Sequence, residues 1–219
     1  MSQVIYRVLS SLLCYPEGDL LDAIPEVAGV LATYPKAQQA LVPLLNYLES
    51  DSLLTLQENY VATFDRNPRH SLHLFEHIHG ESRDRGQAMV DLLEEYRQHG
   101  FAATSDELPD YVPLFLEFLA QVDEETSSRL LGEAIHVLAL IGNKLEQNGS
   151  PYHHVFTVLR QLTPVEPLPL VEPPIRDMDE AMEQFGPSAD GVEPLLKPGA
   201  VQAMTFYPKG SAPATGCHG

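Results

Sequence analysis

The chain has 219 residues, and its 31 aspartate and glutamate residues outnumber its 13 lysine and arginine residues. The resulting formal charge of −18 argues against nucleic acid and anionic membrane surfaces as partners, because both require a basic protein surface. A basic partner suits this charge, although an acidic composition that serves solubility alone explains it equally well. With 44% hydrophobic residues, the chain is long enough to bury a substantial core in a single domain.

The cysteines and the first apolar run exclude several further classes. Cys14 and Cys217 form no CxxC pair, so neither a disulfide framework nor a cysteine-based zinc site is expected. The first apolar run contains Arg7 and no small-residue cleavage site follows it, which favours an amphipathic helix over a signal peptide. No apolar stretch approaches the roughly 20 residues that a bilayer span needs. We therefore expect a soluble, cytoplasmic protein that does not insert into membranes.

Apolar residues recur at helical spacing in the first part of the chain and predict helices over about residues 4–13, 20–31, 36–48 and 53–64. Pro25 is expected to break or restart the second helix, and Pro43 to kink the third or delay its start. Ser52 is the predicted N-cap of the fourth helix. Asn67 and Pro68 are expected to end it.

Helical periodicity also dominates the second part. A short helix is predicted over residues 71–79, with Gly80 as its C-terminal cap. Ser82 is the predicted cap of a helix that stops at Gly100, and a loop covers residues 101–109. Asp110 is the predicted N-cap of the next helix, residues 124–147 form the clearest helix, and Ser150 opens the last, which runs to residue 162. No run of alternating strands is present, so the predicted fold class is all-α.

The composition changes after Thr163. Five prolines fall between residues 164 and 174, and the remainder is rich in proline, glycine and acidic residues with little periodicity. Such a segment buries too little apolar surface to offset its ordering entropy. We predict a helical domain over residues 1–162 and a proline-rich acidic tail over residues 163–219. The tail is expected to be extended or disordered, with a transient helix near residues 177–185.

The stretch over residues 60–86 holds the densest mixture of histidine, charge and aromatic side chains. His73, Glu76 and His77 match the HxxEH pattern, in which two histidines one helical turn apart bind zinc and the glutamate polarises a bound water. A zinc-dependent hydrolase is therefore the alternative function. A polar helix face that makes hydrogen bonds and ion pairs is the interpretation we favour, because three specified residues match easily by chance.

Arg83 and Arg85 begin a predicted helix, where the helix dipole favours acidic residues instead. We expect these arginines to have acidic partners, with Asp65, Glu76 and Glu81 or a ligand carboxylate as candidates. An internal ion-pair network that joins two helices is the simpler interpretation.

Two stretches carry a family likeness: TFDRNPRHSLHLFEHIHGESRDRGQAMVDLL over residues 63–93 and ELPDYVPLFLEFL over residues 107–119. They closely resemble the NarJ-type nitrate reductase assembly chaperones of the TorD/DmsD class of redox-enzyme maturation proteins. The likeness covers roughly residues 1–162 and is most specific over residues 64–119. It implies a single helical-bundle domain of the TorD-like type and no enzymatic activity.

The resemblance also implies a client. Chaperones of this type bind the N-terminal segment of the apo catalytic (alpha) subunit of a respiratory nitrate reductase. They assist insertion of the molybdenum–bis(molybdopterin guanine dinucleotide) cofactor without binding it stably, and they delay membrane docking until maturation is complete. Cofactor-biosynthesis proteins are further candidate partners. The E-P-x-D-H signature of the wider class reads Glu107-Leu108-Pro109-Asp110-Tyr111 here, so roles tied to the histidine, including nucleotide binding, are not carried over.

A basic, amphipathic peptide that docks as a helix in an apolar groove would use aromatic anchors and acidic side chains at the edge. The residues predicted to make apolar contacts are Phe64, Leu72, Phe75, Tyr111, Leu114 and Phe115. Those predicted to receive basic side chains are Asp65, Glu76, Glu107, Asp110 and Glu117. Those predicted to organise the site are His73, His77, His79, Arg83 and Arg85.

Overall fold

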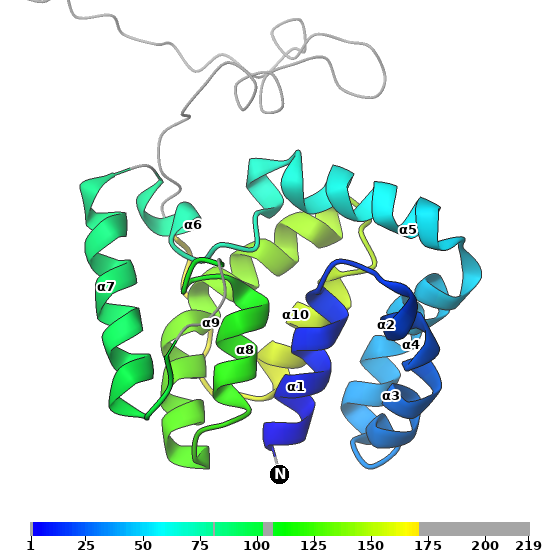
Figure 1. The fold of residues 1–219 in the computed structure, drawn as a ribbon, viewed down its shortest axis with the longest axis horizontal. Coiled ribbons are helices and arrows are strands. Elements are labelled where there is room, and N and C mark those ends of the chain that lie inside the picture. The colour runs from blue at the N-terminus through cyan, green and yellow to red at the C-terminus, as the bar shows by residue number, and fades with distance from the viewer. Residues whose placement is uncertain (1, 81, 103–106, 171–219) are drawn as a thin grey trace, which may run out of the picture. The chain divides into compact units, whose positions relative to one another are not determined.

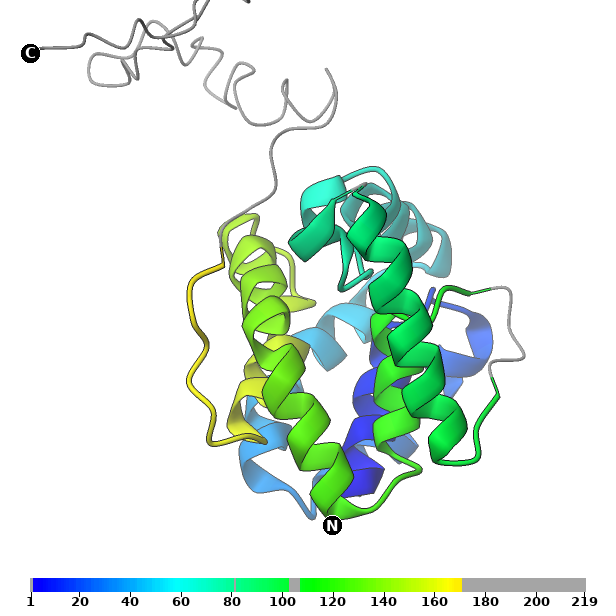
Figure 2. The same ribbon diagram turned by 90° about the vertical axis from the view of Figure 1, so that its left-hand side faces the viewer.

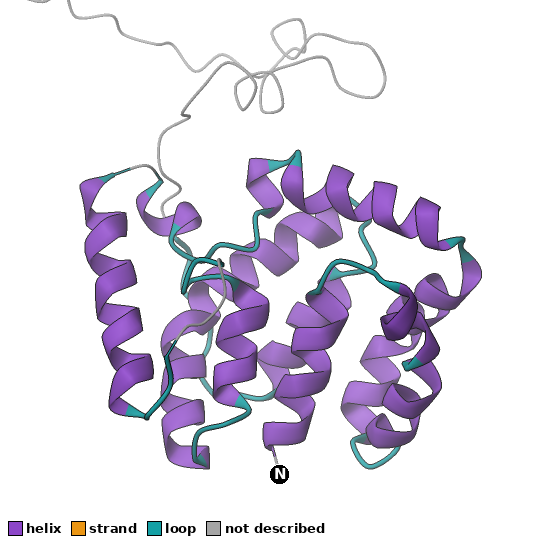
Figure 3. Cartoon of the chain, viewed as in Figure 1, coloured by secondary structure: helices purple, strands orange, loops and turns teal. Residues whose placement is uncertain are grey.

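A computed structural model describes residues 2–80, 82–102 and 107–170 of the chain (Figure 1). These residues form α-helices and loops without a strand, which confirms the all-α prediction (Figure 3). The helices are α1 (Ser2–Leu13), α2 (Gly18–Asp22), α3 (Ile24–Leu31), α4 (Pro35–Ser50), α5 (Leu53–Tyr60), α6 (Glu76–His79), α7 (Arg83–Gln98), α8 (Val112–Leu119), α9 (Glu124–Gln147) and α10 (His153–Gln161). A π-helical turn, η1 (Val61–Asp65), extends α5, and a 3-10 turn, η2 (Pro68–His70), follows it.

The core forms where α10 packs against both α9 and α4, and where α1 packs along α8. Figure 1 shows α2, α3 and α4 at one side of this centre and α7 at the other. The helices contribute one apolar stripe each, as their sequence periodicity requires. Examples of fully buried side chains are Leu9, Leu12, Leu41, Leu131, Leu138 and Phe156. None of the helices in the described ranges is long and apolar enough to cross a bilayer.

Gly142 sets the distance between α9 and α10. A Cβ atom at this position would lie 2.6 Å from the Cβ atom of Phe156 on α10. Real Cβ atoms do not approach so closely, so only glycine allows the two helices to pack as they do. Glycine is a poor helix former, but at this position in α9, the longest helix, close packing requires it.

Most helix boundaries in the first part agree with the sequence. Ser52 caps α5 by accepting a hydrogen bond from the backbone N–H of Thr55 at 3.2 Å. A new helix, α3, starts just before Pro25, as one of the two alternatives predicted. The predicted delay in the start of the third helix is wrong, because α4 begins at Pro35 and continues through Pro43. Proline at a first helical position has its φ already set for the helix, and its missing N–H costs nothing there.

Three predicted local features of the second part are wrong. Residues 71–75 are not helical, and only Glu76–His79 form a helix before Gly80. Asp110 is not an N-cap, because α8 begins at Val112 and the Asp110 side chain points into the protein. Ser150 does not cap α10 either, since its buried hydroxyl has no hydrogen-bond partner in the described structure. In the first two cases a contact with a distant part of the chain replaces the local pattern.

The chain beyond α10 is described as far as Leu170. Residues 163–170 run in extended form along α9 (Figure 2). A hydrogen bond from the backbone N–H of Leu168 to His136 Nδ1, 3.0 Å long, attaches this segment to the helix. The sequence did not predict this packing. Residues 171–219, with the candidate helix at 177–185, lie outside the described residues, so the predicted domain boundary at residue 162 stays a prediction.

Candidate functional site

The two stretches that carry the family likeness pair through their backbones. His73 and Tyr111 form an isolated antiparallel β-bridge. The N–H of Val112 donates to the carbonyl of Leu72 at 2.8 Å, and the N–H of Leu74 donates to the carbonyl of Asp110 at 3.0 Å. This pairing explains why residues 71–75 are not helical: their hydrogen-bonding groups serve the segment before α8 instead. The bridge brings the histidine-rich stretch directly against the start of α8.

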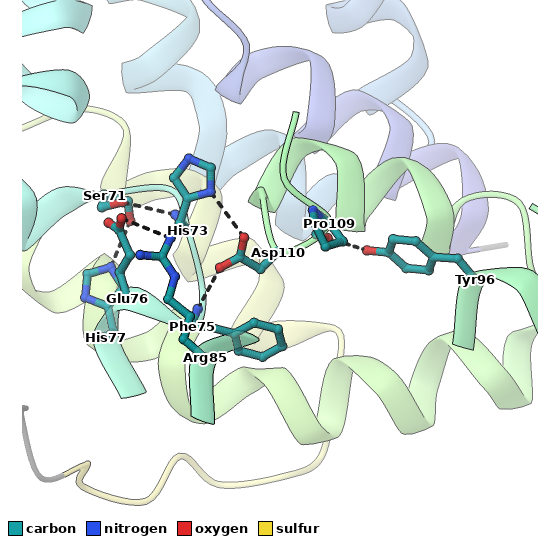
Figure 4. A network of polar contacts seen from close by, with 9 residues as sticks. All are labelled: Ser71, His73, Phe75, Glu76, His77, Arg85, Tyr96, Pro109 and Asp110. Atoms are coloured by element: carbon teal, nitrogen blue, oxygen red, sulfur yellow. Dashed lines mark hydrogen bonds and ion pairs between the residues drawn. The ribbon is translucent and has the colours of Figure 1, made fainter. Parts of the chain in front are cut away.

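Asp110 lies at the centre of this junction with no exposed surface. Its carboxylate accepts a hydrogen bond from the backbone N–H of Phe75 at 3.1 Å and lies 3.3 Å from His73 Nδ1 (Figure 4). Burial acts to raise the pKa of the Asp110 carboxyl, but the bonds from His73 and Phe75 outweigh it and hold that pKa below its usual range. The same bond raises the pKa of His73. The contact therefore favours the charged forms of both side chains, with Asp110 fully buried and the His73 side chain 25% exposed.

Further polar contacts fix the elements around this pair, as Figure 4 shows. His77 Nε2 lies 2.8 Å from the carbonyl oxygen of Ser71. An ion pair of 3.1 Å joins Arg85 on α7 to Glu76 on α6, which confirms one of the acidic partners predicted for the arginines. The hydroxyl of Tyr96 donates to the carbonyl of Pro109 at 2.8 Å. Both α6 and α7 are thus attached to the loop that carries Asp110.

This geometry contradicts the predicted zinc site. The HxxEH chemistry requires His73 and His77 on one face of one helix, but His73 precedes α6 and takes part in the β-bridge. Its Nδ1 atom faces Asp110, whereas the Nε2 atom of His77 faces the backbone at Ser71. Among the residues that the structure describes, no group of three or more histidine, cysteine, aspartate or glutamate side chains is arranged to hold a metal ion. The i, i+4 spacing misleads because the helix that it presumes does not form.

The charges of four acidic side chains from separate segments act on the Tyr111 phenol or on the Cys14 thiol. Burial raises the pKa of the Tyr111 phenol, and the negative charges of Glu107 and Asp65 raise it further. Partial burial likewise raises the pKa of the Cys14 thiol, with additional contributions from Glu117, Glu107 and Glu17. We call these four exposed acids, Glu17, Asp65, Glu107 and Glu117, the acidic rim. Three of them were predicted from the sequence.

Partly exposed apolar groups lie in the same segments as the rim. Tyr15 and Leu108 are 42% and 41% exposed, and Tyr111 and Leu114 are half-buried. The Tyr111 hydroxyl lies 3.4 Å from that of Tyr60, which donates to the carbonyl of Leu13 at the end of α1. The surface therefore combines apolar groups with exposed negative charges. Such a surface suits a partner with an apolar stripe and basic side chains.

The structure distributes the other predicted site residues between core and surface. Phe64, Leu72 and Phe115 are core residues, with exposures of 6%, 3% and 3%. Phe64 packs its ring against Tyr60 and Tyr152, with centroid distances of 4.7 and 5.0 Å. Those that retain partial or full exposure are Phe75, Glu76, His79 and Arg83. The buried residues Phe64, Leu72 and Phe115 support the site from the core and present little surface to a partner.

Sequence reasoning missed Glu17, Tyr15 and Tyr60. Tyr15 and Glu17 follow α1 and lie more than 40 residues before the histidine-rich stretch of residues 60–86. No spacing rule in the sequence links these two residues to that stretch. Tyr60 lies within the predicted fourth helix, where its spacing alone indicates no more than a core position. The π-helical turn after Tyr60 was also not predicted, although such turns often occur at functional sites. Only the packing of α1 against α8, and the contacts of Tyr60 with Leu13 and Tyr15, bring these residues together.

Comparison with known proteins identifies the family. The family model described as the nitrate reductase delta subunit matches residues 32–158. The chain belongs to this family. A relative in Escherichia coli (strain K12), the nitrate reductase molybdenum cofactor assembly chaperone NarJ, is 43% identical over 159 residues, which cover 71% of this chain and 67% of the relative. A Bacillus subtilis (strain 168) relative with the same chaperone name is 31% identical over 160 residues, 72% of this chain and 86% of its own.

The fold has a solved counterpart as well. The solved structure of a redox enzyme maturation protein from Archaeoglobus fulgidus matches this fold with a TM-score of 0.56 and 18% sequence identity. The match covers 74% of this chain and 93% of the Archaeoglobus fulgidus chain. At this identity the match supports the fold alone, and it confirms the predicted helical class. The Escherichia coli and Bacillus subtilis relatives are named as assembly chaperones, which places this chain in a non-enzymatic family. The zinc hydrolase alternative is wrong on this ground as well as on its geometry.

Proposed function

We propose that this protein is a chaperone that binds the N-terminal segment of the apo catalytic subunit of a respiratory nitrate reductase. It acts in the cytoplasm, keeps the client competent for insertion of the molybdenum–bis(molybdopterin guanine dinucleotide) cofactor, and delays membrane docking until maturation is complete. The names of the relatives support the nitrate reductase client and the role in cofactor assembly. The segment that is bound, and the effect on docking, are our inference.

The feature that supports the binding site is a set of exposed acids whose negative charges act on the half-buried Tyr111, in the case of Asp65 and Glu107, and on Cys14, in the case of Glu17, Glu107 and Glu117. The segments that hold these four acids also hold apolar groups that are still accessible. Each acid is exposed, so it costs little to keep charged in the free protein. A basic, amphipathic helix would place its apolar face on Tyr111, Leu114 and Leu108 and its basic side chains on the rim.

The buried charged pair gives this surface its shape. His73 and Asp110 hold residues 71–75 against the start of α8, and Tyr111 follows Asp110 directly. In our proposal His73, His77, Arg85 and Asp110 are positioning residues that set where Tyr111 and Glu107 lie. His79 ends α6 and Arg83 begins α7, so both lie at the junction of these two helices. A preorganised site of this kind reduces the ordering cost of binding.

The molybdenum cofactor is the cargo of the client in this scheme, and no residue here is assigned to hold it. The chaperone acts on the apoprotein, and cofactor-biosynthesis proteins would meet the client while the chaperone holds it. The site described above is assigned to the client, and none of its residues is assigned to the cofactor-biosynthesis proteins.

Calorimetric titration of the full-length protein tests the proposal. The ligand is a synthetic peptide with the N-terminal sequence of the host's nitrate reductase catalytic subunit, and a scrambled peptide of equal charge is the control. We expect sub-micromolar binding of the native peptide and at least tenfold weaker binding of the scrambled one, because apolar side chains at helical spacing must face the site together. Equal binding of the two peptides would mean that the negative charge attracts any cation and that no client-specific site exists.

A further inference from the structure

The segment of residues 163–170, which we call the strap, has a sequence that holds it extended. Pro164, Pro167 and Pro169 fix their own φ angles near −65°, and each restrains the residue before it to an extended conformation. The backbone N–H of Val165 is satisfied locally by Thr163 Oγ1 at 3.2 Å. The strap therefore resembles the preorganised polyproline II ligands that proline-recognition domains bind at low entropic cost.

The strap is seated on a groove made by α9 and α10. At its first end, Val165 lies over Gly132, where a Cβ atom would meet Val165 Cγ2 at 3.2 Å. At its other end, Leu170 packs against the core. Between these points a cavity of about 340 Å³ separates Leu168 and Pro169 from Ala139 and Asn143 of α9 and from Arg160 of α10. A second cavity of about 290 Å³ lies beside it, under Val165 and Pro167. The strap therefore covers the groove without filling it.

A hydrogen bond from the backbone N–H of Leu168 to His136 Nδ1 spans this groove at 3.0 Å. A ring nitrogen accepts a hydrogen bond only when it carries no proton, and both ring nitrogens of a protonated histidine are donors. Protonation of His136 would therefore convert the acceptor into a donor that faces the N–H of Leu168. Histidine is the side chain whose charge ordinarily changes between about pH 5 and 8.

Charged groups of the described residues lie on each element that meets at His136. Arg160 on α10 lines the same cavity as His136. Glu133, which is paired with Arg129, precedes His136 on α9, and Glu166 on the strap lines the neighbouring cavity. The bond from the Leu168 N–H requires an unprotonated Nδ1 on His136 whatever these charges contribute.

We propose that the strap is a releasable occupant of an extended-peptide groove on α9 and α10, and that protonation of His136 detaches it. Release opens the cavities beneath Leu168 and Pro167 into one continuous groove. The device is independent of the client site, because the strap and the acidic rim share no residue.

Nuclear magnetic resonance on the full-length protein tests the proposal with two readouts: the hydrogen-exchange protection of the Leu168 amide, corrected for intrinsic rates, and the nuclear Overhauser contact between Val165 methyl and Gly132 α protons. At pH 7.5 we expect both in the native protein. At pH 5.0 we expect the contact to weaken and the protection to fall roughly 2- to 12-fold, the range that one net hydrogen bond provides.

Three variants separate the bond from general packing. His136→Asn keeps an acceptor oxygen near the position of Nδ1, so it should retain both readouts at both pH values. His136→Leu should lose them at both pH values. Leu168→Pro removes the N–H but keeps the extended backbone, and it should also release the strap, whereas Leu168→Ala should not.

The proposal is overturned if His136→Leu or Leu168→Pro retains the Val165–Gly132 contact at pH 7.5. It is overturned equally if the His136→Asn variant shows the same pH dependence as the native protein. Because no client peptide is present in these measurements, failure here leaves the proposed chaperone function untouched, and failure of peptide binding leaves the strap untouched.

Discussion

The carboxylate of Asp110 accepts a hydrogen bond from the backbone N–H of Phe75, 35 residues earlier in the chain, at 3.1 Å. Together with the His73 contact at 3.3 Å, this bond fixes the turn before α6 to the turn before α8. The rest of the site follows from it, because Tyr111 and Glu107 lie on either side of Asp110. A buried charge with full hydrogen bonding is a strong constraint on position, and a costly one to disturb.

Replacement of Asp110 by alanine should destabilise the protein by about 2–4 kcal/mol, because it leaves the Phe75 N–H and the charge of His73 without their partner. Asp22→Ala, at an exposed position at the end of α2, is the matched control and should change stability by less than about 0.5 kcal/mol. Urea unfolding followed by circular dichroism measures both. Equal midpoints for the two variants would show that the buried contacts of Asp110 contribute nothing net.

The same pair predicts a pH dependence of stability with a definite sign. The raised pKa of His73 means that its contribution is fully present below its ordinary value of 6.5 and is lost as the pH rises through the folded-state value. The lowered pKa of Asp110 means that its contribution is present above 3.8 and is lost as the pH falls through the folded-state value. Both contributions coexist between these limits.

Comparison with His73→Gln isolates this effect. The native protein should exceed the variant in unfolding free energy by more at pH 5.5 than at pH 8.5, because the stabilisation that a raised His73 pKa provides is fully present below the ordinary value of 6.5 and declines as the pH rises above it. Chemical unfolding at the two pH values measures the difference. A stability gap that does not change with pH would argue that the pair is neutral in the folded protein.

Charge reversal in the acidic rim should weaken binding of the client peptide. Glu107→Lys and Glu117→Lys should each reduce affinity about 5- to 30-fold at low salt, since reversing one charge near a basic ligand costs on the order of 1–2 kcal/mol. The loss should shrink at high salt, where exposed charges are screened. Isothermal titration calorimetry at two salt concentrations measures it.

Glu125→Lys provides the control for the rim. This exposed acid begins α9, close to the start of α1, where Gln3 donates to the carbonyl of Val122 at 2.7 Å. The rim lies at the other end of α1, beside Cys14. We expect less than a twofold effect on affinity from Glu125→Lys. If it weakens binding as much as Glu107→Lys, the net charge of the protein attracts the peptide and the rim has no special role.

Gly142→Ala should destabilise the protein although alanine is the better helix former. Alanine gains up to about 1 kcal/mol in helix propensity, but its Cβ atom would lie 2.6 Å from Phe156 Cβ. Forcing α9 and α10 apart costs about 1–3 kcal/mol or more, so the net loss should be about 1–2 kcal/mol.

Gly86 on α7 is the matched position for this test, because a Cβ atom there would meet nothing within 4 Å. Gly86→Ala should raise stability by about 0.4–1 kcal/mol. Thermal unfolding distinguishes the two variants by the sign of the shift in Tm. A stabilising Gly142→Ala would mean that the two helices can separate without loss of packing.

Sequence reasoning succeeded where local rules suffice. Ser52 was identified as a cap from its place before an apolar period, and the long helix α9 from its own periodicity. Both depend on interactions between residues three or four apart, which the sequence states directly. The family likeness of residues 63–93 and 107–119 was equally readable, and the delta subunit family model matches a range that contains both.

Tertiary structure decided how the residues of the site come together. The sequence determined that the protein is helical, acidic and a member of its chaperone family, since composition, periodicity and motifs are properties of the chain itself. It misplaced Asp110, because a carboxylate before a helix is locally an excellent cap and only the arrival of Phe75 and His73 turns it inward. It gave no sign that Glu17 joins Glu107 or that Leu168 meets His136, because contacts between distant segments depend on how helices pack, and no spacing in the sequence encodes that.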